Sequence, residues 1–372
     1  MIINSYRKII VPHTTAIPRA GEGSTVRLND GNILLVYSQF RGAGMDHDIA
    51  ELFGGILDIN TGKINEGKVF SPSKTALNQM SVSLERLQDG SIGMVFCQKQ
   101  DRDHSTILFS RSLDEGKSWM DPVNISNCTK ANYLVVNNDR LRQFSSGRIA
   151  VPACLYADAL ITNIPSKLVI IYSDDYGKTW SVTEPISPSS NPILPHRMDT
   201  NNEWGNLSAS LFREQEPGVE ELKDGRILYY CRSMIGYMYY AYSKDGGITW
   251  GELQAAADIV APNSPQSIRR IPDSSRLICV YNNRRKVAFG DKVNHWDWRT
   301  PLSLAVSDDN GASWQNVANI EDDSHNYCYT SILFIGGEIL LTYYESENYL
   351  NGSRRNLANL KMQILTIPLR FS

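Results

Sequence analysis

Several kinds of segment are missing from this chain of 372 residues, and each absence narrows the range of functions. No apolar stretch approaches the ~18 residues that a membrane-spanning helix needs, so we expect no membrane partner. The segment from Met1 to Lys8 lacks a basic start followed by a continuous apolar region, which predicts no secretory leader. The net charge of −3 gives no electrostatic reason to expect binding to nucleic acid.

The cysteine and histidine patterns argue against disulfides and metals. The six cysteines are scattered along the chain, and no two of them form a Cys-x-x-Cys pair. This pattern predicts reduced, buried thiols in a cytoplasmic protein. The six histidines show no metal-ligand spacing, so we expect neither a metal site nor a cofactor.

What the chain does contain is an octapeptide repeat, Ser-x-Asp-x-Gly-x-(Ser/Thr)-Trp, in four copies. The copies span residues 112–119, 173–180, 243–250 and 307–314, and their tryptophans are 61, 70 and 64 residues apart. Each copy combines turn-forming residues with a large aromatic side chain that can fix the turn to a neighbouring sheet. We therefore interpret the octapeptide as scaffold, repeated in stacked copies of one supersecondary unit.

A second, weaker repeat gives the number of units. Two apolar runs flank a tight polar turn, as in antiparallel hairpins, at residues 27–34, 86–93, 142–150, 221–228, 270–278 and 333–340. Units of roughly 60 residues with about four strands have the size of propeller blades. The sequence thus predicts an all-β fold, a six-bladed β-propeller with four-stranded antiparallel blades, in a single domain over residues 1–372.

The hairpins also predict where a site lies. Residues about eight positions before and after each turn meet at the open end of the hairpin, and in a propeller all open ends face the same way. Before the turns these positions hold Glu22, Ser81, Asn138, Glu216, Gln266 and Tyr329. After the turns they hold Gln39, Arg232, Asn282 and Glu345, with Arg41 slightly further along. This ring is too polar for a core layer and predicts a pocket at one mouth of the central channel.

The octapeptide resembles the Asp-box of the bacterial neuraminidase repeat, and nearly the whole chain is similar to the sialidase superfamily of six-bladed propellers. Two segments carry much of this resemblance, residues 215–226 with Cys231-Arg232-Ser233, and Tyr329-Thr330-Ser331-Ile332. The resemblance implies a glycoside hydrolase with Tyr329 as nucleophile and Glu216 as its partner. It further implies that Arg232 and Arg299 grip a substrate carboxylate.

The resemblance assigns the remaining roles less directly. Asp46 and Asp48 occupy the region of the acid/base Asp, with Asp46 preferred, and Glu345 resembles the Glu that orients the first Arg of a substrate-binding triad. That first Arg belongs to an Arg-Ile-Pro segment in the family, whereas residues 20–25 here contain no Arg in register. Arg19 lies nearby and could reach the site from another backbone position. Glu22 places a carboxylate at the mouth, which disfavours an anionic ligand unless an Arg offsets it.

The chemistry can also be argued from the residue types. A sugar that carries a carboxylate at its anomeric carbon repels an anionic nucleophile, whereas a neutral Tyr with a neighbouring base avoids this repulsion. We expect an exo-acting glycosidase that removes a terminal acidic sugar, with a carbohydrate as its partner. Two alternatives remain. One is a glycosidase or lyase acting on a uronic-acid or neutral glycoside, with Glu22, Asp46 or Glu216 as acid and base, and the other is a glycan-binding propeller without catalysis.

Overall fold

The computed structural model describes residues 4–71, 73, 75–156, 166–186, 215–233, 236–284, 299–347 and 357–366. Within these ranges the fold is all β, and the helical element is a single 3-10 turn, η1 (Ile125–Cys128). No helix among these residues is long and apolar enough to cross a membrane.

The strands pair antiparallel in successive sets along the chain. The first three sets are β2 (Arg19–Arg27), β3 (Ile33–Phe40), β4 (Ala50–Asp58) and β5 (Lys63–Phe70); β6 (Asn78–Arg86), β7 (Ile92–Lys99), β8 (Ser105–Ser112) and β9 (Val123–Asn124); and β10 (Tyr133–Val135), β11 (Arg142–Gln143), β12 (Ile149–Tyr156), β13 (Lys167–Ser173) and β14 (Ser181–Val182). Here β10 and β11 both pair with β12.

The remaining strands continue the same pattern. The fourth set is β15 (Gln215–Glu221), β16 (Ile227–Arg232), β17 (Tyr237–Ser243) and β18 (Gln254–Val260), and the fifth is β19 (Ser267–Arg270), β20 (Leu277–Asn282), β21 (Leu302–Ser307) and β22 (Gln315–Asn319). The last comprises β23 (His325–Ile335), β24 (Glu338–Glu347), β25 (Ala358–Thr366) and the N-terminal strand β1 (Asn4–Val11). The two ends of the described chain thus share one sheet.

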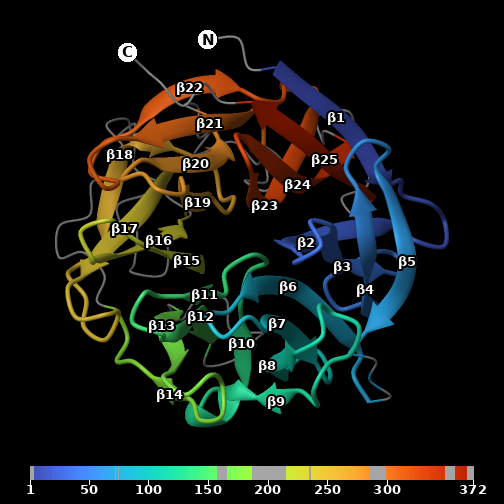
Figure 1. Cartoon of the computed structure of the whole chain (residues 1–372), viewed down its shortest axis with the longest axis horizontal. Coiled ribbons are helices and arrows are strands. Elements are labelled where there is room, and N and C mark those ends of the chain that lie inside the picture. Colours follow the sequence, from blue (N-terminus) through green and yellow to red (C-terminus); the bar gives the residue numbers. More distant parts are fainter. Residues whose placement is uncertain are drawn as a thin grey trace, which may run out of the picture.

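The sets are arranged around a common centre, with β2, β6, β15, β19 and β23 nearest to it (Figure 1). The apolar core lies between neighbouring sets. One cluster, for example, joins Val26 and Val36 of the first set to Leu84 and Met94 of the second. Each hairpin predicted from the sequence pairs two strands at the expected turn.

The octapeptides form the same turn in every copy, and the copy at 173–180 illustrates it. The Ser173 hydroxyl accepts the Gly177 N–H at 2.8 Å, and Asp175 accepts both the N–H and the hydroxyl of Thr179. Gly177 has a φ of 85°, and a Cβ there would lie 2.2 Å from the ring of Phe109. Trp180 packs edge-on against the same ring, with centroids 5.0 Å apart. The octapeptide therefore ties its turn to the strand set before it, in agreement with the scaffold interpretation.

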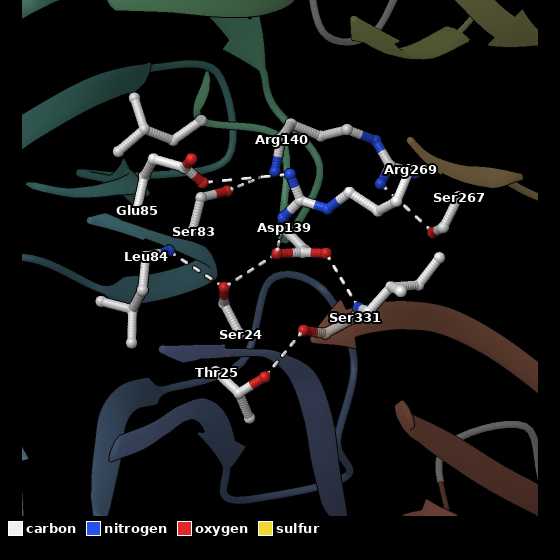
Figure 2. Close-up of polar contacts among 12 residues, drawn as sticks. Ser24, Thr25, Ser83, Leu84, Glu85, Asp139, Arg140, Ser267, Arg269 and Ser331 are labelled. Atoms are coloured by element: carbon white, nitrogen blue, oxygen red, sulfur yellow. Dashed lines mark hydrogen bonds and ion pairs between the residues drawn. The ribbon is translucent and has the colours of Figure 1, made fainter. Parts of the chain in front are cut away.

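A buried polar network joins the strand sets near their common centre. Asp139, which is 1% exposed, accepts hydrogen bonds from the Ser24 hydroxyl at 3.1 Å, the Ile332 N–H at 3.0 Å and Arg269 Nη2 at 2.8 Å. Figure 2 shows these contacts meeting from β2, β19 and β23, with the carboxylate of Asp139 at their centre. The neighbouring Arg140 donates to the Ser267 hydroxyl. Because its donors come from separate sets, the network fixes the inner strands relative to one another.

Candidate functional site

The candidate site is built on β-bulges in the inner strands. The pairing register shifts once in each of β2, β6, β15 and β23. Each shift contains one non-glycine residue with a positive φ, namely Glu22 (52°), Ser81 (58°), Glu216 (47°) and Tyr329 (58°). Bulges redirect a side chain, and unfavourable backbone conformations of this kind concentrate at functional sites. The four residues are members of the ring predicted from the hairpins.

These four side chains share one cavity of about 170 Å³. In the described part of the chain, the cavity is lined by polar and ionisable groups on several strand sets and by an apolar wall between the second and third sets. The lining residues are Glu22, Asp46, Met80, Ser81, Cys97, Lys99, Tyr133, Val135, Val136, Tyr156, Gln215, Glu216, Arg232 and Tyr329. Pockets for drug-sized ligands measure roughly 300–1,000 Å³, so this cavity suits one small unit of a larger ligand.

Tyr329 and Glu216 form a hydrogen-bonded pair on one side of the cavity. The Tyr329 hydroxyl donates to Glu216 Oε1 at 3.1 Å, and Arg232 Nη1 lies 2.8 Å from Glu216 Oε2. Arg232 also donates to Gln215 Oε1 at 2.6 Å. Burial and the charge of Glu216 raise the pKa of the Tyr329 phenol well above its usual value, although Arg299 and Arg232 oppose this shift. The phenol is therefore neutral and needs a base to become a nucleophile.

Arg299 lies behind Tyr329. Its guanidinium carbon is 5.4 Å from the centroid of the Tyr329 ring, and Nη1 donates to the Tyr344 hydroxyl at 2.7 Å and to Cys328 Sγ at 3.2 Å. The Tyr344 ring in turn packs against Tyr329, with centroids 5.3 Å apart. Arg299 thus contributes positive charge to the site from beneath Tyr329.

Arg19 pairs with two carboxylates. It forms ion pairs with Glu22 through Nη2 and with Asp46 through Nη1, the latter at 2.5 Å. Its guanidinium also lies 4.2 Å from the centroid of the Phe40 ring. Glu22 accepts a further hydrogen bond from the Ser81 hydroxyl at 2.7 Å. The charge of Arg19 is therefore shared between two acids rather than directed at a ligand.

The two aspartates of the loop after β3 have different surroundings. Asp46 lines the cavity, and Lys99 Nζ donates to its backbone oxygen at 2.9 Å. Removal from water raises the pKa of Asp46, but the charges of Arg19 and Lys99 and the hydrogen bond from Arg19 outweigh this and hold the pKa well below its usual range. Asp48 accepts the backbone N–H groups of Ala43 and Met45, so it closes the turn of the loop.

Two other predicted residues lie apart from the cavity lining. Glu345, which by the family resemblance orients the first Arg of the triad, forms an ion pair with Lys361 at 2.6 Å. Gln266 is buried, and its side chain donates to the Ser264 carbonyl at 2.7 Å. The backbone carbonyl of Gln266 accepts a hydrogen bond from Arg140 at 2.5 Å, which connects Gln266 to the central network.

Sequence reasoning missed Lys99, Tyr133, Tyr156 and Tyr344. Lys99 and Tyr156 lie nine positions after the turn glycines Gly90 and Gly147, so extending the count along the outgoing strands by one residue would have found both. The rings of Tyr133 and Tyr156 pack edge-on with centroids 6.1 Å apart, and Lys99 Nζ lies 5.7 Å from the centroid of Tyr133. These residues give the cavity an aromatic wall with a cation beside it.

Comparisons with known proteins point to one family. The model of the BNR repeat-like domain matches residues 72–339. A sialidase from Micromonospora viridifaciens is 28% identical over 51% of this chain and 25% of its own length, and one from Bacteroides fragilis is 23% identical over 66% of this chain and 40% of its own length. The chain therefore spans less than half the length of these curated relatives.

A solved structure extends the likeness to the whole fold. The structure of a Hadza microbial sialidase matches with a TM-score of 0.71 at 16% identity, over 96% of this chain and 68% of that one. At this identity the likeness concerns the fold. The family match covers most of the chain, including the octapeptides and the strands that carry Glu216 and Tyr329, and on this ground the chain belongs to the BNR repeat-like domain family of the sialidase superfamily.

Proposed function

We propose that the protein is an exo-acting glycoside hydrolase of the sialidase type, which removes a terminal acidic sugar with retention of configuration. The observation that carries this proposal is the Tyr329–Glu216 hydrogen bond of 3.1 Å inside a cavity that suits one sugar unit. A nucleophile in hydrogen-bond reach of a base is the arrangement that covalent catalysis requires. The sialidase relatives named above support the same reaction class.

In the first step, the Tyr329 oxygen attacks the anomeric carbon while its proton passes to Glu216. The glycosidic C–O bond breaks, and an acid on the opposite side of the cavity protonates the leaving oxygen. In the second step, water attacks the same carbon and gives a proton to the group that acted as acid in the first step, while the tyrosyl C–O bond breaks and Tyr329 recovers its proton from Glu216. The family resemblance implies Asp46 as the acid/base group in preference to Asp48, which closes the turn of the loop, and Glu22 is a second carboxyl group that lines the same cavity.

The substrate class rests on the charges that surround the cavity. Arg232 and Lys99 line it, and Arg299 lies directly behind Tyr329, so a sugar carboxylate bound near them meets positive charge. One observation favours a second candidate, a glycosidase or lyase acting on a uronic-acid or neutral glycoside. Arg19 is already paired with Glu22 and Asp46, which leaves fewer cations for anion capture than a full triad would supply.

We further propose that the strand sets are the blades of one closed six-bladed propeller, a single domain over residues 1–372. The sequential antiparallel pairing supports this proposal, as does the sharing of one sheet by β1 and β25. A cytoplasmic location stays a prediction, which rests on the scattered positions of the six cysteines and on the lack of any Cys-x-x-Cys pair in the sequence. A carbohydrate partner, without nucleic acid or membrane, likewise follows from the charge and the family.

The test is release of a fluorophore from a panel of sialosides, uronides and neutral glycosides. We expect wild type to cleave one class of acidic glycoside, and Tyr329→Phe and Glu216→Gln each to lower kcat by roughly 10²–10⁴-fold because they remove one catalytic unit. Tyr240→Phe is the matched control, since its hydroxyl bonds Gln254 on the fourth set, away from the cavity lining.

Two other outcomes of this assay would contradict the proposed mechanism or the proposed activity. Full activity in Tyr329→Phe with loss in Glu216→Gln would replace the Tyr nucleophile by a carboxylate mechanism. Glycan binding by wild type without turnover of any substrate would identify a binding propeller instead.

A further inference from the structure

Two carboxylates compete for one guanidinium at the edge of the cavity. Arg19 contacts Glu22 through one terminal nitrogen and Asp46 through the other. Both acids line the cavity, and Glu22 lies on β2, on the other side of the ring from β15, which carries Glu216 (Figure 1). Arg19 is shared between the two acids, whereas Lys99 adds a second cation beside Asp46, so Asp46 has more positive charge around it than Glu22 does.

The surroundings of the two acids differ enough to decide which one carries the proton. The side chain of Glu22 is 1% exposed, whereas that of Asp46 is 60% exposed. The ionised form of Asp46 is stabilised chiefly by the charges of Arg19 and Lys99, which outweigh the cost of its partial removal from water. The charged and titratable groups around Glu22 are Arg19, Asp46, Glu216 and Cys97, so Glu22 faces two other acids. Buried carboxyl groups next to other carboxylates hold their protons.

We propose that Glu22, rather than Asp46, is the proton donor for the leaving group, and that Asp46 is the charged residue that keeps Arg19 in place. This inference rests on the proposed function, since it assigns an acid to the same reaction. The bulge in β2 directs Glu22 into the cavity in the same way that the bulges in β15 and β23 direct Glu216 and Tyr329. All three reacting groups thus come from equivalent positions of the fold.

Glu22, Tyr329 and Glu216 account for every proton that is transferred in the two steps. The Glu22 carboxyl gives its proton to the glycosidic oxygen as the C–O bond breaks, while Tyr329 forms its bond to carbon and passes its proton to Glu216. The Glu22 carboxylate then accepts a proton from the attacking water, and the tyrosyl bond breaks as Glu216 returns the first proton. Enzymes commonly separate acid and base in this way, through pairs of groups whose environments move their pKa values apart.

The shifts of the two groups agree with this assignment. Burial raises the pKa of Glu22, as do the charges of Asp46 and Glu216, against the opposing effect of Arg19 and the Ser81 hydroxyl. The pKa of Asp46 is shifted in the opposite direction. A group with a depressed pKa is a poor proton donor near neutral pH.

The first test measures the proton itself, without a substrate. Infrared difference spectra at pH 7 between wild type and Glu22→Gln should contain the C=O stretch of a protonated carboxyl group, and the spectra between wild type and Asp46→Asn should not. Glu51→Gln serves as the control, because Glu51 forms a partly exposed pair with Arg41. An ionised Glu22 in the unliganded protein at pH 7 overturns the assignment.

The second test uses the need of the leaving group for a proton. With a sugar alcohol as leaving group, Glu22→Gln should lower the rate of bond cleavage by at least about 10²-fold. With an activated phenol, which needs no proton, Glu22→Gln should give a burst close to the wild-type rate and then stall, and azide should restore turnover. Asp46→Asn should slow both leaving groups alike. The proposal is overturned if Asp46→Asn, instead of Glu22→Gln, shows slow cleavage with the sugar alcohol together with a burst, a stall and rescue by azide with the activated phenol.

The two proposals fail in different ways. If wild type cleaves nothing in the panel, the proposed function is refuted, and the infrared experiment still decides whether Glu22 holds the proton. If wild type is active and Glu22→Gln behaves like wild type with both leaving groups, the hydrolase remains and the role of Glu22 is refuted.

Discussion

Removing the Asp139 carboxylate should destabilise the whole ring of strand sets. Asp139 accepts three hydrogen bonds at 2.8–3.1 Å, from Ser24, Ile332 and Arg269, which lie on three different inner strands. In Asp139→Ala the Ile332 N–H loses its acceptor, and an unsatisfied buried donor costs about 1–3 kcal/mol. Arg269 loses its closest acid, and breaking a buried pair costs about 3–5 kcal/mol.

These costs overlap, because Arg269 is 14% exposed and has a second acid, Glu85, at 3.9 Å. We therefore expect Asp139→Ala to lower the free energy of unfolding by about 3–5 kcal/mol. Asp139→Asn should cost roughly half as much, because its amide oxygen still accepts one hydrogen bond. Asn also tolerates the positive φ of 57° at this position better than Ala does.

Urea unfolding followed by tryptophan fluorescence measures these differences. Glu51→Ala is the control, because its pair with Arg41 is partly exposed and should be worth less than about 1 kcal/mol. Adding Arg269→Met to Asp139→Ala should cost less than the sum of the two single changes, since the unpaired charge is then absent. If Asp139→Ala costs no more than Glu51→Ala, the network does not hold the inner strands together.

Two further predictions concern the octapeptides. Trp180→Ala removes the edge-on contact with Phe109 and the hydrogen bond to the Gly177 carbonyl, so it should cost about 3 kcal/mol in thermal unfolding and leave the activity per folded molecule unchanged. A normal melting temperature with lost turnover would assign the octapeptide to the site. Hydrogen bonds from Thr179, above all, lower the pKa of Asp175 to about 2, below its ordinary value. This stabilisation is present above about pH 4 and is lost as the pH falls toward 2. Asp175→Asn should therefore be about 1 kcal/mol less stable at pH 7, an amount reduced by solvent screening, and a pH series should show the difference vanishing near pH 2. A constant difference across the series would contradict this.

Sequence reasoning identified the all-β class and several residues of the cavity by counting along the chain. The octapeptides and hairpins recur at readable spacings, and counting back from each turn selected Glu22, Ser81, Glu216 and Tyr329, which do share a cavity. Counting along a strand tells at which end a residue lies. It does not tell which side chains pair across neighbouring sets, because that depends on contacts between segments far apart in the chain.

The contacts of two predicted site residues show this limit. Arg19 was considered as a ligand for the substrate, but its partners Glu22 and Asp46 come from a strand and a loop whose approach no local pattern encodes. The position of Arg299 behind Tyr329 depends in the same way on the packing of two strand sets. The bulges were also invisible, because the positive-φ positions hold Glu, Ser and Tyr instead of the glycine that usually marks such a backbone.

Those bulges have a consequence for how such a protein can change. Glu22, Ser81, Glu216 and Tyr329 each hold a backbone conformation that costs a non-glycine residue about 1–3 kcal/mol. Glycine would adopt the same backbone conformation without this cost, so each of these four side chains is held at the expense of backbone strain. The same kind of bulge holds an acid at one position, a hydroxyl at another and a phenol at a third, so a single substitution changes the group that it presents. New chemistry on this scaffold therefore needs a side-chain exchange at a pre-formed position, with the backbone left as it is.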